Sequence, residues 1–343
     1  MGFVDRAERC VFDLDPESGA PHGWDFLGSV PVPLRNRVRE AVAQTAPRCL
    51  DTGGAPLKCA FPLGQGGRGP FERLRHIRAL DDFPGMLVSC DGGNAFNRRF
   101  HRTHVEAGAF SGCQPDGAPP EMSQLLDPEG WMGVFAVAPF VMLIDRERLD
   151  GKPTPRRWSD LADPLYRGEV VFGGWKPEGE RRFRSVSEFF LLSMLRRFSV
   201  EGLGRILANV PTLVHSAQMP RLAGTGASVG GVYVAPWFLA DLCPRRAMTE
   251  VVWPEDGALA YPLWLTVQAD RRRALQPLID LFYGNELAAY LAENLYPPLA
   301  PCGRDAIPRG GLTWLGWDYL RSRHAASDLK AARAAFLEFV PCA

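Results

Sequence analysis

The chain has 343 residues, of which 46% are hydrophobic and 23% are charged, the composition of a globular protein. This length is more than one small core needs and suits two compact lobes. Lys plus Arg and Asp plus Glu both total 39, so the formal net charge is zero. That balance argues against a dedicated nucleic-acid binder, which needs a basic excess. No apolar stretch reaches the ~18–20 residues that span a bilayer, so we expect no membrane insertion.

The amino-terminal residues 1–9 lack the basic start and the apolar run of a secretory signal. Taken literally, the sequence predicts a cytoplasmic protein. A mature protein without its leader would begin in a similar way, and the location would then be periplasmic.

The eight cysteines are scattered along the chain, and none forms a Cys-x-x-Cys pair. Because zinc and iron–sulfur sites need closer spacing, we expect no metal centre and no cofactor. The thiols are expected to be small buried or surface side chains of a reducing compartment.

Short apolar segments alternate with helical patterns from residue 57 onward. Strands are predicted over 57–61 and 85–89, and helices over 33–45, 70–79 and 94–107. This order of strand, loop and helix predicts a mostly parallel sheet with helices on both faces.

A second α/β unit follows a long apolar run at 134–144, which is long enough to cross between two lobes. Its strands are predicted over 168–174 and 229–233, and its helices over 185–198 and 199–208.

The chain then has the pattern of a return crossing at 248–253. Two further helices are predicted over 270–284 and 285–295.

Three segments of the chain carry a family resemblance. The first contains Trp158-Ser159-Asp160-Leu161-Ala162-Asp163-Pro164 and ends at Gly168, the second is Trp253-Pro254-Glu255-Asp256-Gly257-Ala258, and the third is the helix pair at 274–291. In sequence and in order they resemble the ABC-importer extracellular solute-binding proteins, in the ferric-iron and polyamine branch. The resemblance extends over about residues 57–300.

The resemblance implies an α/β, two-lobed fold of the type 2 periplasmic-binding-protein kind, in which each lobe is a mostly parallel sheet flanked by helices and two crossings form the hinge. Lobe 1 would comprise 55–138 and 254–343, and lobe 2 would comprise 139–253. Residues 1–54 would form an N-terminal extension that packs on a lobe or mediates dimerisation, so both a monomer and a dimer remain possible.

The same resemblance implies a function in ligand capture. The two lobes would close on a metal ion, an oxyanion or a small charged organic solute in the cleft between them. The partner would be an ABC permease, or the protein would sense or handle the solute in the cytoplasm.

Ligands of open α/β sheets bind beyond the carboxyl ends of the strands, and Gly-rich turns there offer backbone N–H groups to an anion. The loops after the predicted strands therefore supply the candidate ligand-binding residues. These residues are Gln65, Gly66, Ser89, Cys90, Asp91, Gly174, Trp175, Ser216, Gln218, Tyr233, Trp237 and Asp256.

Ferric members of the family carry a consecutive Tyr pair after the strand that matches 229–233. Here Pro236-Trp237 stands at about that place and only Tyr233 remains nearby, so a hard ferric ion is disfavoured. A polyamine would need carboxylates and aromatic faces for its cations. The side chains of suitable type are Asp91, Glu255, Asp256, Trp175, Trp237 and Tyr261.

Three histidines are candidate functional groups. His101 and His104 lie three residues apart on a predicted helix, a spacing that can share a metal, but no third ligand is identifiable and a solvated helix face is the simpler interpretation. His215 lies next to Ser216 in a candidate loop, so its titration would matter most.

The sequence contains no nucleophile elbow, P-loop, His-Glu-x-x-His or dinucleotide fingerprint. A binding protein is therefore favoured over an enzyme. The alternative is an enzyme that reuses the two-lobed scaffold, with Cys90 or His215 as its reactive group.

Overall fold

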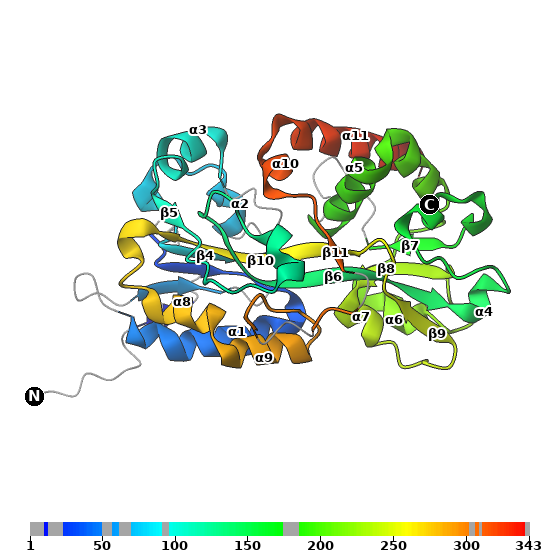
Figure 1. Cartoon of the computed structure of the whole chain (residues 1–343), viewed down its shortest axis with the longest axis horizontal. Coiled ribbons are helices and arrows are strands. Elements are labelled where there is room, and N and C mark those ends of the chain that lie inside the picture. Colours follow the sequence, from blue (N-terminus) through cyan, green and yellow to red (C-terminus); the bar gives the residue numbers. More distant parts are fainter. Residues whose placement is uncertain are drawn as a thin grey trace, which may run out of the picture. The chain divides into compact units, whose positions relative to one another are not determined.

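A computed structural model describes residues 10–12, 23–49, 57–61, 70–90, 96–173, 185–301, 306–308 and 311–339. The chain divides into two compact units, the first from residues 1–137 and 262–306 and the second from residues 138–261 and 307–343. Each unit combines strands and helices, as predicted (Figure 1). Each is described by itself below.

The sheet of the first unit is mostly parallel, as predicted. Its strands lie in the order β1 (Cys10–Phe12), β3 (Leu57–Ala60), β2 (Phe26–Gly28), β4 (Met86–Ser89) and β10 (Ala258–Gln268). β1 to β4 run parallel, and β10 is antiparallel to β4, with Trp264 opposite Ser89. β5 (Phe110–Ser111) pairs with the end of β10.

Helices cover both faces of this sheet (Figure 1). On one face lie α1 (Val32–Thr45), α8 (Gln276–Tyr283) and α9 (Asn285–Glu293). On the other lie α2 (Pro70–Leu74) and α3 (Arg98–Phe100), which continues as a π-helix over His101–Val105.

Two aromatic clusters form the core of the first unit. Phe26 stacks on Phe61 and Phe282 at centroid distances of 6.3 Å and 6.2 Å. Phe83 stacks on Phe96 at 5.0 Å and packs against Phe100 at 5.1 Å. Since aromatic rings bury a large apolar area, these contacts contribute to the hydrophobic stabilisation of the unit.

Several element boundaries of the first unit differ from the prediction. The helix expected over 70–79 ends at Leu74, and the one expected over 94–107 is a short α-helix followed by the π-helix. The segment 23–49, expected in a separate extension, lies within the unit, because β2 is inserted between β3 and β4 with Phe26 and Leu27 fully buried.

The sheet of the second unit is mixed. β6 (Gly133–Asp145), which begins in the first unit, pairs antiparallel with β8 (Val232–Pro236) and with β9 (Thr249–Val252). β7 (Val170–Phe172) runs parallel to β8 at the other edge. β11 (Leu312–Thr313) pairs parallel with the first residues of β10.

Helices lie on both faces of the second sheet (Figure 1). α5 (Ser185–Ala208) packs along α11 (Arg323–Phe339) on one face, and α6 (Met219–Leu222) and α7 (Trp237–Asp241) lie on the other. The short helices are α4 (Arg146–Leu149) and α10 (Trp317–Arg321). α5 is broken at Ser199, whose φ of 64° is not helical, so the two predicted helices are both present.

The structure corrects the predicted position of the return crossing. The predicted crossing segment 248–253 is β9, which stays in the second unit beside β6. β10 passes from the second unit to the first instead, and all eleven of its residues are buried, as a strand covered on both faces requires.

The carboxyl-terminal residues also differ from the expected lobe. The resemblance places residues 307–343 in lobe 1, but they fall in the second unit. The reason is that α11 buries Ala332, Ala335 and Phe336, and Phe336 packs edge-on against Phe172 of β7 at 6.1 Å.

Candidate functional site

The carboxyl ends of parallel strands mark where a ligand is expected in each sheet. In the first unit, β2 and β4 end side by side, and the Ser29 N–H donates to the Val88 carbonyl at 3.0 Å. Ser89 is buried at the end of β4, whereas Cys90 is half-buried. Of the two candidates, Cys90 is the one that a solute can reach.

Tyr296 lies close enough to Cys90 for the thiol to influence its ionisation. Burial, and to a lesser degree the neighbouring Cys90 and Tyr290, raise the pKa of the Tyr296 phenol above its ordinary value. The phenol is fully buried. It is therefore neutral at ordinary pH.

In the second unit, Ser216 lies next to the end of β7. A Cβ atom built on Gly173 would stand 3.5 Å from the Ser216 Cβ, and Gly173 forms a parallel bridge with Val214. The 3₁₀ turn Ser216–Gln218 begins there, with Ser216 half-buried and Gln218 exposed. Both candidates are thus brought to the carboxyl edge of the sheet.

His215 has a structural task at this edge. Its Nδ1 accepts a hydrogen bond of 3.1 Å from the Ala217 N–H and so caps the 3₁₀ turn. That nitrogen is already occupied, so the imidazole positions the turn rather than serving as a base through Nδ1.

Trp237 follows β8 at the same edge and is half-buried. Its ring packs edge-on against Trp253, which follows β9, at a centroid distance of 5.2 Å and an angle of 83°. The Trp253 indole N–H is bonded to the Gly311 carbonyl at 2.9 Å, so Trp253 is fixed. The edge therefore combines an aromatic surface with the polar groups of Ser216 and Gln218.

Asp256 is engaged by the fold. Its carboxylate accepts hydrogen bonds from the Trp158 N–H at 3.2 Å and from the Arg197 guanidinium at 2.7 Å. Arg197 also donates to the Thr313 hydroxyl at 2.7 Å. Since its charge is paired, Asp256 is poorly suited to neutralise a cationic ligand.

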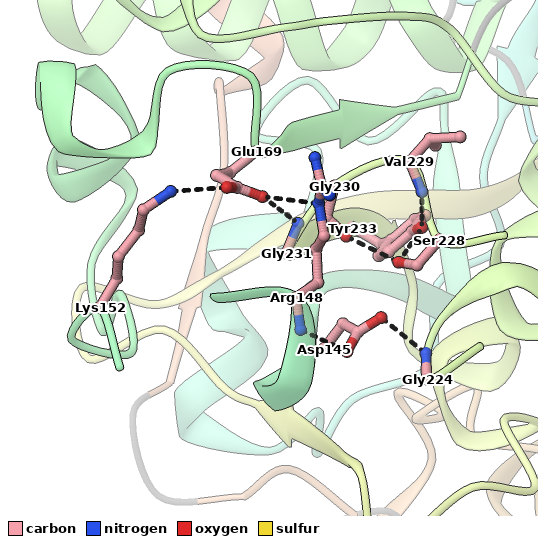
Figure 2. A network of polar contacts seen from close by, with 10 residues as sticks. All are labelled: Asp145, Arg148, Lys152, Glu169, Gly224, Ser228, Val229, Gly230, Gly231 and Tyr233. Carbon is pink, nitrogen blue, oxygen red and sulfur yellow. Dashed lines mark hydrogen bonds and ion pairs between the residues drawn. The ribbon is translucent and has the colours of Figure 1, made fainter. Parts of the chain in front are cut away.

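Tyr233 points away from the carboxyl edge. The side chain is fully buried, and its hydroxyl interacts with the Ser228 hydroxyl at 2.9 Å and accepts from the Val229 N–H at 3.0 Å (Figure 2). Because 228–229 precede β8, the hydroxyl lies at the amino end of the strand. Tyr233 is therefore a core residue.

Two buried carboxylates complete a polar network at this amino end (Figure 2). Glu169 accepts from Lys152 Nζ at 2.6 Å and from the Gly231 N–H at 2.9 Å. Asp145 accepts from the Gly224 N–H at 2.7 Å and from the Arg148 N–H at 3.1 Å. The network fixes the loop between α6 and β8 and was not detected in the sequence, because its members lie far apart along the chain.

The remaining predicted site residues lie outside the described residues. They are Gln65, Gly66, Asp91, Gly174 and Trp175.

His101 and His104, the pair with metal-ligand spacing, do not point to a common ligand. His101 Nδ1 contacts Glu106 at 3.3 Å, and His104 Nε2 lies 3.4 Å from the Arg78 carbonyl, so the two rings have separate partners. Within the described ranges, no three His, Cys, Asp or Glu side chains are arranged to hold a metal ion. In those ranges every helix is also too short or too polar to cross a bilayer.

Comparison with known proteins supports the fold found here. Residues 81–323 match the protein family described as bacterial extracellular solute-binding protein. No curated protein gives a sequence match.

Solved structures of similar fold cover almost the whole chain. The apo ferric ion-binding protein A of Pasteurella haemolytica has a TM-score of 0.62 at 12% identity and covers 93% of this chain and 99% of its own. The Bordetella ferric binding protein has a TM-score of 0.58 at 15% identity and covers 91% and 98%. A Trichodesmium protein, solved in complex with iron and citrate ligands, has a TM-score of 0.60 at 13% identity and covers 91% and 98%. At these identities the likeness shows the fold alone.

Proposed function

Because the chain belongs to the family of bacterial extracellular solute-binding proteins, whose profile matches 81–323, we propose that it captures a small organic solute at the carboxyl edges of its sheets. The observation that carries the proposal is the edge of the second unit. There Ser216, Gln218 and Trp237 remain accessible, while the ionisable candidates Tyr233 and Asp256 are engaged by the fold.

A bare ferric ion fits the described residues less well. It would need phenolate and carboxylate oxygens, and Tyr233 is buried with its hydroxyl bonded to Ser228 and Val229. An indole ring and hydroxyl and amide groups at the same edge of the sheet suit an organic solute that has both an apolar part and hydrogen-bonding groups. Ferric binding is thus a property of the structural neighbours that we do not transfer to this chain.

Binding without chemical conversion is the second part of the proposal. The family is one of solute-binding proteins, and His215 uses Nδ1 to cap a turn. Cys90 is proposed as a contact residue of the first unit and not as a nucleophile. Three points stay predictions. They are that loops of both units share one ligand, that an ABC permease is the partner, and that the residues outside the described ranges contribute to binding.

The family description favours the periplasmic alternative for the location, since it is extracellular. The cytoplasmic location predicted from residues 1–9 is not confirmed. Cell fractionation of the full-length protein distinguishes the two.

The decisive experiment is a thermal-shift screen of the purified protein against organic acids, amino acids, polyamines, oxyanions and ferric citrate. A ligand at a hundredfold excess over its Kd stabilises the native state by about 2.7 kcal/mol, which raises the melting temperature measurably. We expect an organic solute to do so. Stabilisation by ferric ion with every organic class inert would contradict the proposed ligand class.

Matched serine variants test the site. Ser216→Ala should weaken solute binding by about 1 kcal/mol, or roughly fivefold in Kd, because it removes one hydrogen bond at the carboxyl edge. Ser228→Ala removes a hydroxyl at the opposite edge and should leave Kd unchanged even if it lowers the melting temperature. Equal effects of both variants on Kd would place the ligand elsewhere.

A further inference from the structure

Two neighbouring segments of the first unit carry a group of exposed arginines. One segment is α2 with the turn that follows it, and the other is α3 with the π-helix. The six side chains, here called the arginine surface, are Arg73, Arg75, Arg78, Arg98, Arg99 and Arg102.

Hydrogen bonds hold the two segments together. The Asn97 amide donates to the Ile77 carbonyl at 2.7 Å, and His104 Nε2 lies 3.4 Å from the Arg78 carbonyl. Both segments lie on the face of the sheet opposite α1, α8 and α9 (Figure 1). Arg98 and Arg102 are four residues apart, so they project from neighbouring helical turns. The six arginines therefore belong to two contacting segments on one face of the sheet of the first unit.

The charges of the arginine surface are not neutralised by the described part of the chain. Some arginines elsewhere are paired, as Arg37 is with Glu286 and Arg271 with Asp25. None of the six forms an ion pair with a described carboxylate. The nearby Glu106 contacts His101. A local positive excess thus exists in a chain of zero net charge.

Acidic residues do border this surface. Asp81 and Asp82 follow it in the 3₁₀ turn Leu80–Asp82, and Asp82 has an interaction partner of its own. Glu72 also lies within α2, and Glu106 follows the π-helix. The six arginines still outnumber these four carboxylates, so a smaller net positive charge remains, and it acts at low ionic strength.

The chemistry of the surface points to the class of partner. A protein interface needs an apolar centre, and among the described residues of 70–106 no large hydrophobic side chain is exposed. A membrane that carries anionic phospholipids attracts basic groups by charge alone, and a guanidinium binds phosphate with two parallel hydrogen bonds. Such adsorption needs no membrane-spanning helix.

We propose that the arginine surface adsorbs this protein onto membranes that carry anionic phospholipids. The attraction acts through charge, so added salt, which shortens the Debye length, weakens it. It is independent of which solute the protein captures.

Co-sedimentation of the full-length protein with vesicles tests the proposal. We expect binding to phosphatidylcholine vesicles that contain phosphatidylglycerol, no binding to phosphatidylcholine alone, and loss of binding as salt rises. The triple variant Arg98→Gln/Arg99→Gln/Arg102→Gln should weaken the partition onto anionic vesicles by about tenfold or more, since each removed charge reduces the attraction.

A matched control removes three scattered exposed arginines of the second unit, as Arg205→Gln/Arg221→Gln/Arg323→Gln. It changes the net charge by the same amount and should leave vesicle binding within about twofold of the parent protein, because those charges lie outside the arginine surface. Melting temperatures measured in parallel show that both triple variants are folded.

Three outcomes overturn the proposal. They are equal binding to neutral and anionic vesicles, equal losses in the two triple variants, and tighter binding to a short DNA duplex than to anionic vesicles. The last outcome would assign the surface to nucleic acid, whose phosphates attract arginine in the same way.

Discussion

The indole Nε1 of Trp158 donates a hydrogen bond of 2.8 Å to the carbonyl oxygen of Gly257, across 99 residues of sequence. The Trp158 N–H donates to Asp256, and the Glu255 N–H donates to the Arg156 carbonyl at 2.9 Å. Two of the segments that carry the family resemblance are therefore in direct contact. Their residues hold the second unit together, and their contacts are made within the protein.

Trp158→Phe tests this contact. Trp158 is fully buried and packs edge-on against Phe190 at 6.1 Å. Phenylalanine retains an aromatic ring but leaves the Gly257 carbonyl without its donor and leaves unfilled volume. We expect a loss of about 2–4 kcal/mol in the free energy of unfolding, measured by denaturant titration.

Trp237→Phe serves as the control for that substitution. Trp237 is half-buried and lies at the carboxyl edge, where its ring packs on Trp253. Its replacement should change the free energy of unfolding by less than about 1 kcal/mol. A comparable loss in both variants would show that the hydrogen bond and packing of Trp158 contribute no more to stability than those of a half-buried tryptophan.

Asp256 is expected to affect stability and not ligand affinity. Asp256→Asn weakens its bond with Arg197, a pair in which the side chains are 23% and 26% exposed. Solvent screens such a pair, so we expect a loss of about 1 kcal/mol. A double-mutant cycle with Arg197→Gln measures the coupling. A large rise in the solute Kd for Asp256→Asn at unchanged stability would restore Asp256 to the ligand site.

Local patterns were sufficient to predict the fold class. The Trp158 segment, the apolar run of β6 and the Gly-bounded strands each have short-range signals, and they place α/β units in the correct order. The predicted return crossing lies too early in the chain because residues 248–253 also have the pattern of a strand, which is β9. Only the strand pairing shows that β9 remains beside β6.

The site was harder to predict because its residues depend on strand register and distant partners. The strand predicted over 229–233 would end at Tyr233, but β8 spans Val232–Pro236, so Tyr233 is near its beginning. Gly230-Gly231 was a signal for the later start. The sequence predicts Asp256 as a ligand because its partner Arg197, 59 residues away, leaves no local pattern.

Alkaline pH should destabilise the protein through its buried tyrosines. Burial, with a smaller effect of Cys113, raises the pKa of Tyr283, and burial, with smaller effects of Cys90 and Tyr290, raises that of Tyr296. Below the ordinary pKa of about 10 both phenols are neutral in the folded and unfolded chain, so this stability is fully present. Above it only the unfolded chain releases the protons, so stability falls as pH rises.

The slope of stability against pH measures this effect. Each of the two phenols should contribute about 1.4 kcal/mol per pH unit above pH ~10. Tyr296→Phe should reduce the slope by that amount. Any free energy of unfolding that the variant loses at neutral pH should not itself depend on pH. An unchanged slope in the variant, or tyrosinate absorbance that appears before unfolding, would contradict the prediction.

Glu169 should be the most sensitive carboxylate of the polar network in Figure 2. Its side chain is 8% exposed and is bonded to Lys152 and to the Gly231 N–H. Glu169→Gln leaves the ammonium of Lys152, itself 29% exposed, without its counter-charge. Breaking a buried pair costs about 3–5 kcal/mol, and the partial exposure of Lys152 reduces this to about 2 kcal/mol.

Glu255→Gln is the matched control, because Glu255 pairs with Arg157 at 2.9 Å on the surface, where the side chains are 52% and 61% exposed. In denaturant titrations that variant should unfold at the same denaturant concentration as the parent protein. Glu169→Gln should also leave the solute Kd unchanged, since Glu169 precedes β7 and so lies at the amino end of the sheet. A higher Kd with unchanged stability would instead place the solute next to the network. The proposed site at the carboxyl edge would then be wrong.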